Sequence, residues 1–190
     1  MPDLILASAS PRRAQLLRSA GVPFVVFAAN IPEVEVGHLT PHETAQINAY
    51  RKARAIAKRH PDHLVLGADT MVCLNNRSYG KPTSLRDAHR MLGDLQGRTH
   101  EVVTGICLLE QRRHREQVFA ISTLVTMRAL GPRAIRDYVS RINPLDKAGA
   151  YAIQEEGHLI VEAVEGSYSN VVGLPVREVV LAMERWGTGA

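Results

Sequence analysis

The sequence has few cysteines, few aromatic residues and no long apolar run. Its two cysteines, Cys73 and Cys107, form no C-x-x-C pair and lie in apolar segments, so we expect buried, reduced thiols. No apolar run approaches the ~20 residues that span a bilayer. No basic leader precedes the apolar segment that starts at Leu4, and we therefore expect a cytoplasmic protein with no membrane partner.

Familiar catalytic signatures are absent as well. The sequence contains no Walker A segment, no G-x-G-x-x-G, no H-E-x-x-H and no G-x-S-x-G, so none of the activities that these motifs mark is indicated. Aromatic residues make up only 5% of the chain and form no stacking motif. This argues against nucleic-acid binding through the basic segments 51–59 and 112–115, which is one alternative reading of the charge.

The composition that is present is typical of a globular protein, with 45% hydrophobic and 22% charged residues. A chain of 190 residues suits one domain or two closely fused lobes, and it can bury a core without disulfides. The net charge of +4, from 23 Lys and Arg against 19 Asp and Glu, fits an anionic small ligand, nucleic acid or solubility alone.

Helix caps and apolar patterns predict helices that alternate with strands. Ser10 before Pro11 and Thr40 before Pro41 are typical helix starts, and Glu43 would complete a capping box. The mixture predicts an α/β or α+β fold with a mixed sheet, and irregular structure over 146–173. The predicted strands are 4–7, 22–28, 63–68, 71–74, 101–109 and 117–128, and the predicted helices begin at 11, 41, 84, 131 and 175.

A loop of small residues leads into the first predicted helix. Such a loop, here with Ser8, exposes backbone N–H groups at the positive end of the helix dipole. Arg12 and Arg13 stand in the first turn, where the dipole disfavours cations, and a bound phosphate would explain them. The alternative is a capped helix with exposed arginines.

The segment 67–70 (Gly-Ala-Asp-Thr) places Asp69 at the end of a predicted apolar strand. A carboxylate there can hold Mg²⁺ or accept a proton from water, although a turn residue is the alternative. Three more charged residues allow two interpretations, a phosphate or metal site or an ordinary surface position. They are Lys81, which stands between Gly80 and Pro82, Lys52 and Glu33. Gln154, in the small-residue segment 146–154, could read a base edge through its amide.

Together these candidates supply four cations and two acids. Arg12, Arg13, Lys52 and Lys81 would offset the charge of a nucleoside triphosphate, while Glu33 and Asp69 would hold a metal ion. Binding a desolvated triphosphate requires such a set.

The chain resembles the Maf family of nucleotide pyrophosphatases over nearly its whole length. The resemblance rests on six ordered segments, 4–13, 67–70, 80–82, 100–105, 146–154 and 170–175. It implies a single Maf-like domain over 1–190, with an elongated mixed-sheet fold and two lobes around a central cleft, similar to inosine triphosphate pyrophosphatases. It also implies hydrolysis between the α and β phosphates with a divalent cation, Mg²⁺ or Mn²⁺.

The resemblance assigns roles residue by residue. Asp69 matches the catalytic proton acceptor, Glu33 matches a second cleft carboxylate, and the phosphate positions are matched by Ser8, Arg12, Arg13, Lys52 and Lys81. Where the family often has Asp-Glu this chain has Pro32-Glu33, so a paired carboxylate is missing there. With Asp69, Glu33 would hold the metal.

Three residues indicate a branch of the family. Arg13, Thr70 and Gln154 match those of dTTP/UTP pyrophosphatases, whereas the features of the 7-methyl-GTP branch are absent. Modified pyrimidine nucleotides stay open as substrates of such an enzyme, as does a link to cell division arrest. The alternatives left open are a 7-methyl-GTP pyrophosphatase and a non-enzymatic nucleotide-binding regulator of septum formation. A nucleoside triphosphate is the expected partner; the oligomeric state stays open, with a homodimer as one alternative.

Overall fold

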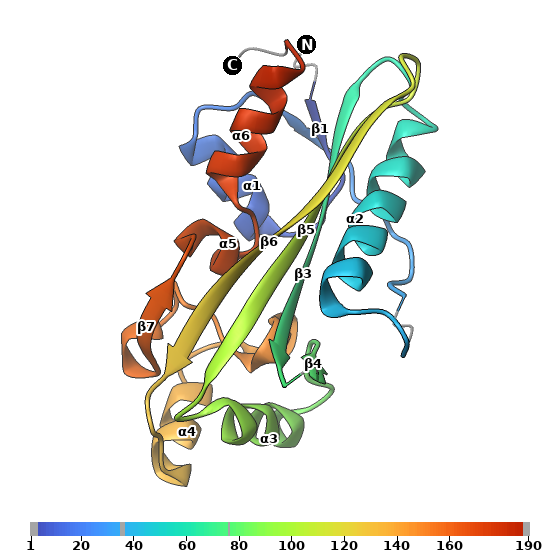
Figure 1. Ribbon diagram of the computed structural model, residues 1–190. Helices are drawn as coiled ribbons and strands as arrows, with labels where there is room; N and C mark the ends of the chain where they lie inside the picture. The colour runs from blue at the N-terminus through green and yellow to red at the C-terminus, as the bar shows by residue number, and fades with distance from the viewer. Residues whose placement is uncertain (1–3, 35–36, 76, 188–190) are drawn as a thin grey trace. The chain divides into compact units, whose positions relative to one another are not determined.

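The structure is a computed structural model that describes residues 4–34, 37–75 and 77–187. The chain divides into two compact units. The first takes in the chain up to Thr70, residues 104–121 and the chain from Gly173; the second takes in 71–103 and 122–172. Within the described residues seven strands form a mixed sheet, which confirms the predicted fold class. The long strands β3 (Leu64–Leu74), β5 (Thr99–Glu110) and β6 (Arg115–Met127) contribute residues to both units (Figure 1).

In the first unit, helices cover both faces of the sheet. The strand β1 (Leu4–Leu6) pairs in parallel with β2 (Val25–Val26) on one side and with β3 on the other. Successive residues of a strand face opposite sides, so Leu4 and Leu6 pack with the helices α1 (Pro11–Ser19) and α6 (Val176–Arg185). Ile5 packs with α2 (Pro41–Ala57) on the opposite face (Figure 1).

The predicted helix starts are confirmed. The Ser10 hydroxyl accepts a hydrogen bond from the Arg13 amide at 3.5 Å and caps α1. At the start of α2, the Thr40 hydroxyl accepts from the Glu43 amide at 3.2 Å, and the Glu43 carboxylate accepts from the Thr40 amide at 2.8 Å. This reciprocal capping box satisfies backbone donors that the first turn leaves open, and it determines where α2 begins.

Glycine allows α2 to lie very close to the sheet. A Cβ atom on Gly67 of β3 would stand 2.2 Å from the Ala49 carbonyl oxygen, and one on Gly105 of β5 would stand 2.3 Å from that of Ala45. Neither strand could carry a side chain at these points without displacing the helix. The short distance brings the polar residues of α2 onto the middle of β3.

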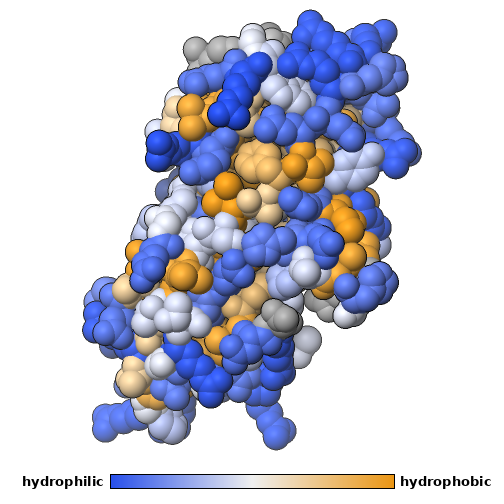
Figure 2. Space-filling view, viewed as in Figure 1, coloured by the Kyte–Doolittle hydropathy of each residue, from blue (hydrophilic) through white to orange (hydrophobic). Residues whose placement is uncertain are grey.

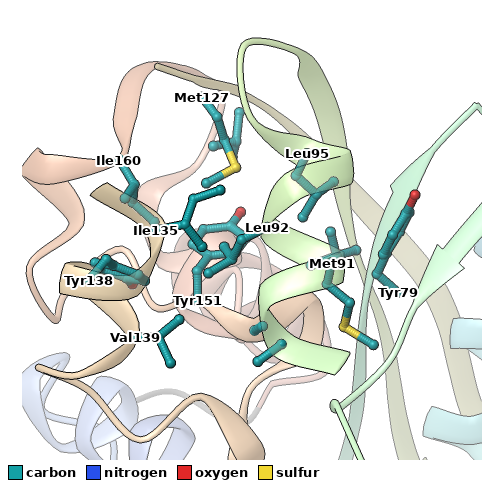
Figure 3. Packing of buried hydrophobic residues seen from close by; sticks show 14 of the residues in the cluster. Tyr79, Met91, Leu92, Leu95, Met127, Ile135, Tyr138, Val139, Tyr151 and Ile160 are labelled. Carbon is teal, nitrogen blue, oxygen red and sulfur yellow. The ribbon is translucent and has the colours of Figure 1, made fainter. Parts of the chain in front are cut away.

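The second unit has its own core. The strands β4 (Arg77–Tyr79) and β7 (Val161–Glu165) pair antiparallel with β3 and β6, respectively. Figure 3 shows side chains of α3 (Leu85–Leu95) and α4 (Pro132–Val139) packed together with Met127, Tyr151 and Ile160. The remaining elements are short: the helix α5 (Tyr168–Val172) and the 3-10 turns η1 (Pro144–Asp146), η2 (Ala148–Ala150) and η3 (Gly157–Leu159).

Three predictions about the elements are wrong. Asp69 does not end a strand, because β3 continues through it to Leu74. The carboxylate is tolerated inside the strand since α2 supplies its partners. The segment 146–173, expected to be irregular, contains β7 and α5, and the strand expected over 22–28 shrinks to two paired residues.

Cys73 and Cys107 are buried and unbridged, as predicted. Hydrophilic side chains dominate the face seen in Figure 2, with apolar residues exposed singly or in small groups. In the part of the chain that the structure describes, no helix has the length and apolar character needed to cross a bilayer.

Candidate active site

The centre of the candidate site is a buried ion pair between α2 and β3 in the first unit. The Lys52 Nζ atom lies 2.6 Å from Asp69 Oδ1, and both residues are buried, at 9% and 5% exposure. The same Nζ lies 2.7 Å from Glu33 Oε1, whose side chain is 56% exposed. One ammonium group thus joins a buried carboxylate to an accessible one, and three residues that the sequence singled out separately meet here.

Burial governs the electrostatics of this pair. It raises the pKa of Asp69, because a desolvated carboxylate favours its neutral form. The Lys52 ammonium opposes that shift, the Glu33 carboxylate adds to it, and the Arg13 guanidinium lowers the pKa again. Asp69 is therefore a carboxylate poised to take up a proton more readily than one in water.

Asn48 is a residue of this cluster that the sequence reasoning missed. Its Nδ2 donates to Asp69 Oδ2 at 3.2 Å and to the Val34 carbonyl at 3.1 Å, and its Oδ1 accepts from the Val34 amide at 2.8 Å. Asn48 therefore orients the Asp69 carboxylate and ties down the segment that carries Glu33. It stands one helical turn before Lys52, and this i, i+4 spacing of polar residues on α2 was a signal that could have revealed it.

Arg13 is the centre of a second hydrogen-bond network in the first unit, beside the loop that precedes α1. Its Nη1 donates to Ser8 Oγ at 3.1 Å, its Nη2 to Thr70 Oγ1 at 2.9 Å and its Nε to the Gly173 carbonyl at 2.9 Å. Desolvation lowers the pKa of Arg13, while Asp69 and Glu33 raise it. The guanidinium is thus fixed in direction by three protein acceptors.

Thr70 links this network to β5. Its hydroxyl shares a hydrogen bond of 3.0 Å with that of Thr104, which is fully buried, and it also donates to the Gly173 carbonyl at 3.2 Å. Thr104 was not predicted as a site residue, although it stands in the segment 100–105 that carries the family resemblance. Arg12, the neighbour of Arg13 on α1, is half-buried.

Lys81 and Gln154 belong to the second unit, and both are exposed. The segments that carry them meet there, because the Gly149 amide donates to the Gly80 carbonyl at 3.1 Å. Lys147 anchors the later segment: its buried Nζ lies 2.8 Å from Asp146 Oδ1 and 3.1 Å from Glu155 Oε2. In the second unit, the structure thus joins the segment that carries Lys81 to the segment that carries Gln154. In the first unit it brings together six of the predicted residues: Ser8, Arg13, Glu33, Lys52, Asp69 and Thr70.

This arrangement suits hydrolysis of a charged ester or anhydride. A buried carboxylate with a raised pKa can accept a proton from water, and adjacent cations can offset charge on a leaving group. Carboxylate oxygens are also the ligands that Mg²⁺ and Mn²⁺ prefer.

A family model and several curated relatives of this chain all indicate the same family. A family model described as Maf-like protein matches residues 3–186. A protein of Moorella thermoacetica named dTTP/UTP pyrophosphatase is 46% identical to this chain, over 98% of this chain and 99% of the relative. A protein of the same name from Gloeobacter violaceus is 52% identical, over 90% of this chain and 89% of the relative. Another protein of that name, from Myxococcus xanthus, is 47% identical over 97% and 92%.

One solved structure also covers almost the whole chain. The Staphylococcus aureus Ham1 protein matches with a TM-score of 0.51 and 18% identity, over 95% of this chain and 98% of that one. At this identity the likeness concerns the fold alone, and it agrees with the mixed α/β architecture.

Proposed function

The chain belongs to the Maf family, and we propose that it hydrolyses dTTP and UTP to the monophosphate and pyrophosphate. The observation that carries the proposal is the buried Asp69 carboxylate held by Lys52 and Asn48. The shared name of the relatives supplies the substrate class, and the match of Arg13, Thr70 and Gln154 to the dTTP/UTP branch supports it.

In the proposed reaction, Asp69 accepts a proton from the water that attacks the α phosphorus. The bond from that phosphorus to the bridging oxygen breaks, and its electron pair leaves with pyrophosphate. The raised pKa of Asp69 supports its role as the base, because a base works best when its pKa approaches the working pH. Lys52 offsets charge near Asp69, and we assign contacts with the phosphates to Ser8, Arg12, Arg13 and Lys81.

We propose a divalent cation, Mg²⁺ or Mn²⁺, as the cofactor, held by Asp69 and Glu33. Their oxygens converge on the single Lys52 ammonium, so this is a point where the fold already concentrates negative charge around a cation. Among the residues described, no cluster of three or more His, Cys, Asp or Glu could hold a metal alone. Two carboxylates would suit Mg²⁺, which prefers oxygen ligands. The ion would supply charge neutralisation for the triphosphate.

A substrate panel tests the proposal. Pyrophosphate release from dTTP, UTP, CTP and 7-methyl-GTP should favour dTTP and UTP, and Asp69→Asn should lower kcat by a factor on the order of 10² to 10⁴. The matched control is Asp137→Asn, an exposed carboxylate of the second unit, which should retain full activity.

Three outcomes would contradict the proposal. Preferred hydrolysis of 7-methyl-GTP would place the chain in the other branch. If the protein bound nucleotides but hydrolysed none of them, a non-enzymatic regulator of septum formation would be favoured. If Asp69→Asn kept the wild-type kcat, the role of Asp69 as the base would be excluded.

A further inference from the structure

A groove of about 620 Å³ lies between α3 and α4 in the second unit. Its lining combines an apolar part, made by Leu130, Pro132 and Ile135, with a polar part that contains Arg86, His89, Gln96 and Arg136. Figure 3 shows Ile135 on the side of α4 that faces α3, with Leu92 opposite it. The volume falls in the range of binding sites, and the proposed hydrolysis makes no use of any residue in the lining.

The charge of the groove has one sign. Among the residues that the structure describes, no acidic residue lines it. The acids of α3, Asp87 and Asp94, instead form ion pairs with Arg90, at 2.7 Å and 3.0 Å. Arg86 and Arg136 have no ion-pair partner within the described part of the chain. Arg86 also stands in the first turn of α3, where the helix dipole disfavours a cation, so a bound anion would relieve an unfavourable placement.

A glycine in α3 gives independent support. Gly93 lies inside the helix, where glycine is less stable than alanine, and a Cβ atom built on it would have nothing within 4 Å. None of the described neighbours therefore requires a glycine at this point, in contrast to the positions of Gly67 and Gly105. Because Gly93 lines the groove, its missing side chain leaves the helix backbone open to close approach by a ligand.

The shape of the lining indicates the kind of ligand. Arg86, His89 and Gly93 have the spacing i, i+3, i+7, so they share one face of α3 over about 10 Å of helix. A groove between two helices, with an apolar part and arginines from both helices, suits a helical segment with an apolar stripe bordered by acids. We propose that this groove binds an acidic amphipathic helical segment of a partner protein.

The test uses two synthetic peptides of about 14 residues, or four helical turns. Both carry leucines on one face; the borders of the leucine stripe are glutamates in one peptide and lysines in the other. Fluorescence anisotropy should show saturable binding of the glutamate peptide to the wild-type protein. The lysine peptide should bind at least about tenfold more weakly.

Charge reversal should exchange the preference. In Arg86→Glu/Arg136→Glu the glutamate peptide should lose at least about tenfold in affinity, and the lysine peptide should gain a similar factor. Arg98→Glu/Arg133→Glu changes the net charge equally in the same unit, at exposed arginines outside the groove lining, and should leave the preference unchanged. Gly93→Leu should abolish binding of the glutamate peptide while circular dichroism shows a folded protein.

Each variant should hydrolyse dTTP at the wild-type rate, which separates this proposal from the proposed function. No saturable binding below about 1 mM of peptide would overturn the proposal, as would an affinity insensitive to these substitutions. Two other occupants would also overturn it. One is a second copy of the chain, shown by a homodimer that Gly93→Leu dissociates; the other is a small amphiphile, shown by variant-sensitive binding of dodecanoate without binding of the peptide.

Discussion

Substitution of Asn48 tests whether the carboxylate of Asp69 is held in place by α2. Asn48→Ala would leave three groups without their partner: the amide and the carbonyl of Val34, and Asp69 Oδ2. A buried polar group that loses its hydrogen bond costs about 1–3 kcal/mol. Val34 is only half-buried, so water can replace part of the loss there. We therefore expect the free energy of unfolding to fall by about 2–4 kcal/mol in total.

Asn48→Asp separates orientation from packing, because it keeps the shape of the side chain. It retains the acceptor for the Val34 amide but replaces the donor 3.2 Å from Asp69 Oδ2 with an acceptor. Two ionised carboxylates at that distance repel by about 5 kcal/mol at an effective dielectric constant of about 20. If Asp69 acts as the base, kcat should fall by a factor on the order of 10² or more, because a misplaced catalytic group costs that much.

The assays are urea unfolding and steady-state release of pyrophosphate from dTTP. Asn143→Asp is the matched control, since Asn143 is exposed and caps η1 through its Oδ1, a role that aspartate can fill. Wild-type kcat and wild-type stability in both Asn48 variants would refute the positioning role. A loss of stability with unchanged kcat would show that Asn48 supports the fold but does not orient Asp69.

Three further substitutions test the close helix packing, a buried histidine and the Thr70 network. Gly67→Ala should lower the free energy of unfolding by about 2–3 kcal/mol, because its Cβ would collide with α2. Gly93→Ala, whose Cβ would meet open space inside α3, should not lower it, and equal urea midpoints for the two variants would contradict the close approach of α2. Burial lowers the pKa of His100 to about 4, so the folded protein keeps a neutral imidazole. The unfolded chain takes up a proton at this residue below about pH 6.5, so the contribution of neutral His100 to the free energy of unfolding is complete above that pH. Stability should fall by about 3 kcal/mol toward pH 4, and His100→Phe should remove this part of the pH dependence in denaturant titrations. Thr70→Val should lower kcat/KM for dTTP and UTP at least about tenfold, because Arg13 loses an acceptor, and Thr70→Ser should restore it; equal values for the valine and serine variants would exclude a role for the hydroxyl.

Local features were predictable because their causes lie within a few residues. The caps of α1 and α2 depend on side chains three positions from the backbone groups that they bind, so Ser10, Thr40 and Glu43 indicated them directly. The end of β3 was not predictable in this way. An aspartate that follows an apolar run normally indicates the end of a strand, because aspartate is rare inside strands. Here β3 continues past Asp69, because side chains of α2 pair with its buried carboxylate.

The candidate site divides along the same line. The family resemblance identified Asp69, Lys52 and Glu33 as residues of one cleft, but it gave no geometry. Lys52 and Asp69 are 17 residues apart, and Arg13 and Gly173 are 160 residues apart. Asn48 had one local signal, its i, i+4 spacing with Lys52 on α2, but its partner Asp69 lies on another element. Thr104 had no such signal, because a polar residue in a strand has no local signature when its partner lies on another strand.

The sequence by itself therefore determined the class of fold, the helix starts, the buried cysteines and the family, because caps, apolar periodicity and ordered motifs act locally or are read directly. Only the tertiary structure decided that Lys52 pairs with both Glu33 and Asp69, that Arg13 is held by Ser8, Thr70 and Gly173, and that α3 and α4 leave a cationic groove. The physical reason is that ion pairing and burial depend on distances in space. For the Lys52–Asp69 pair, the distance follows from how closely α2 can approach β3, which the absence of a side chain at Gly67 makes possible.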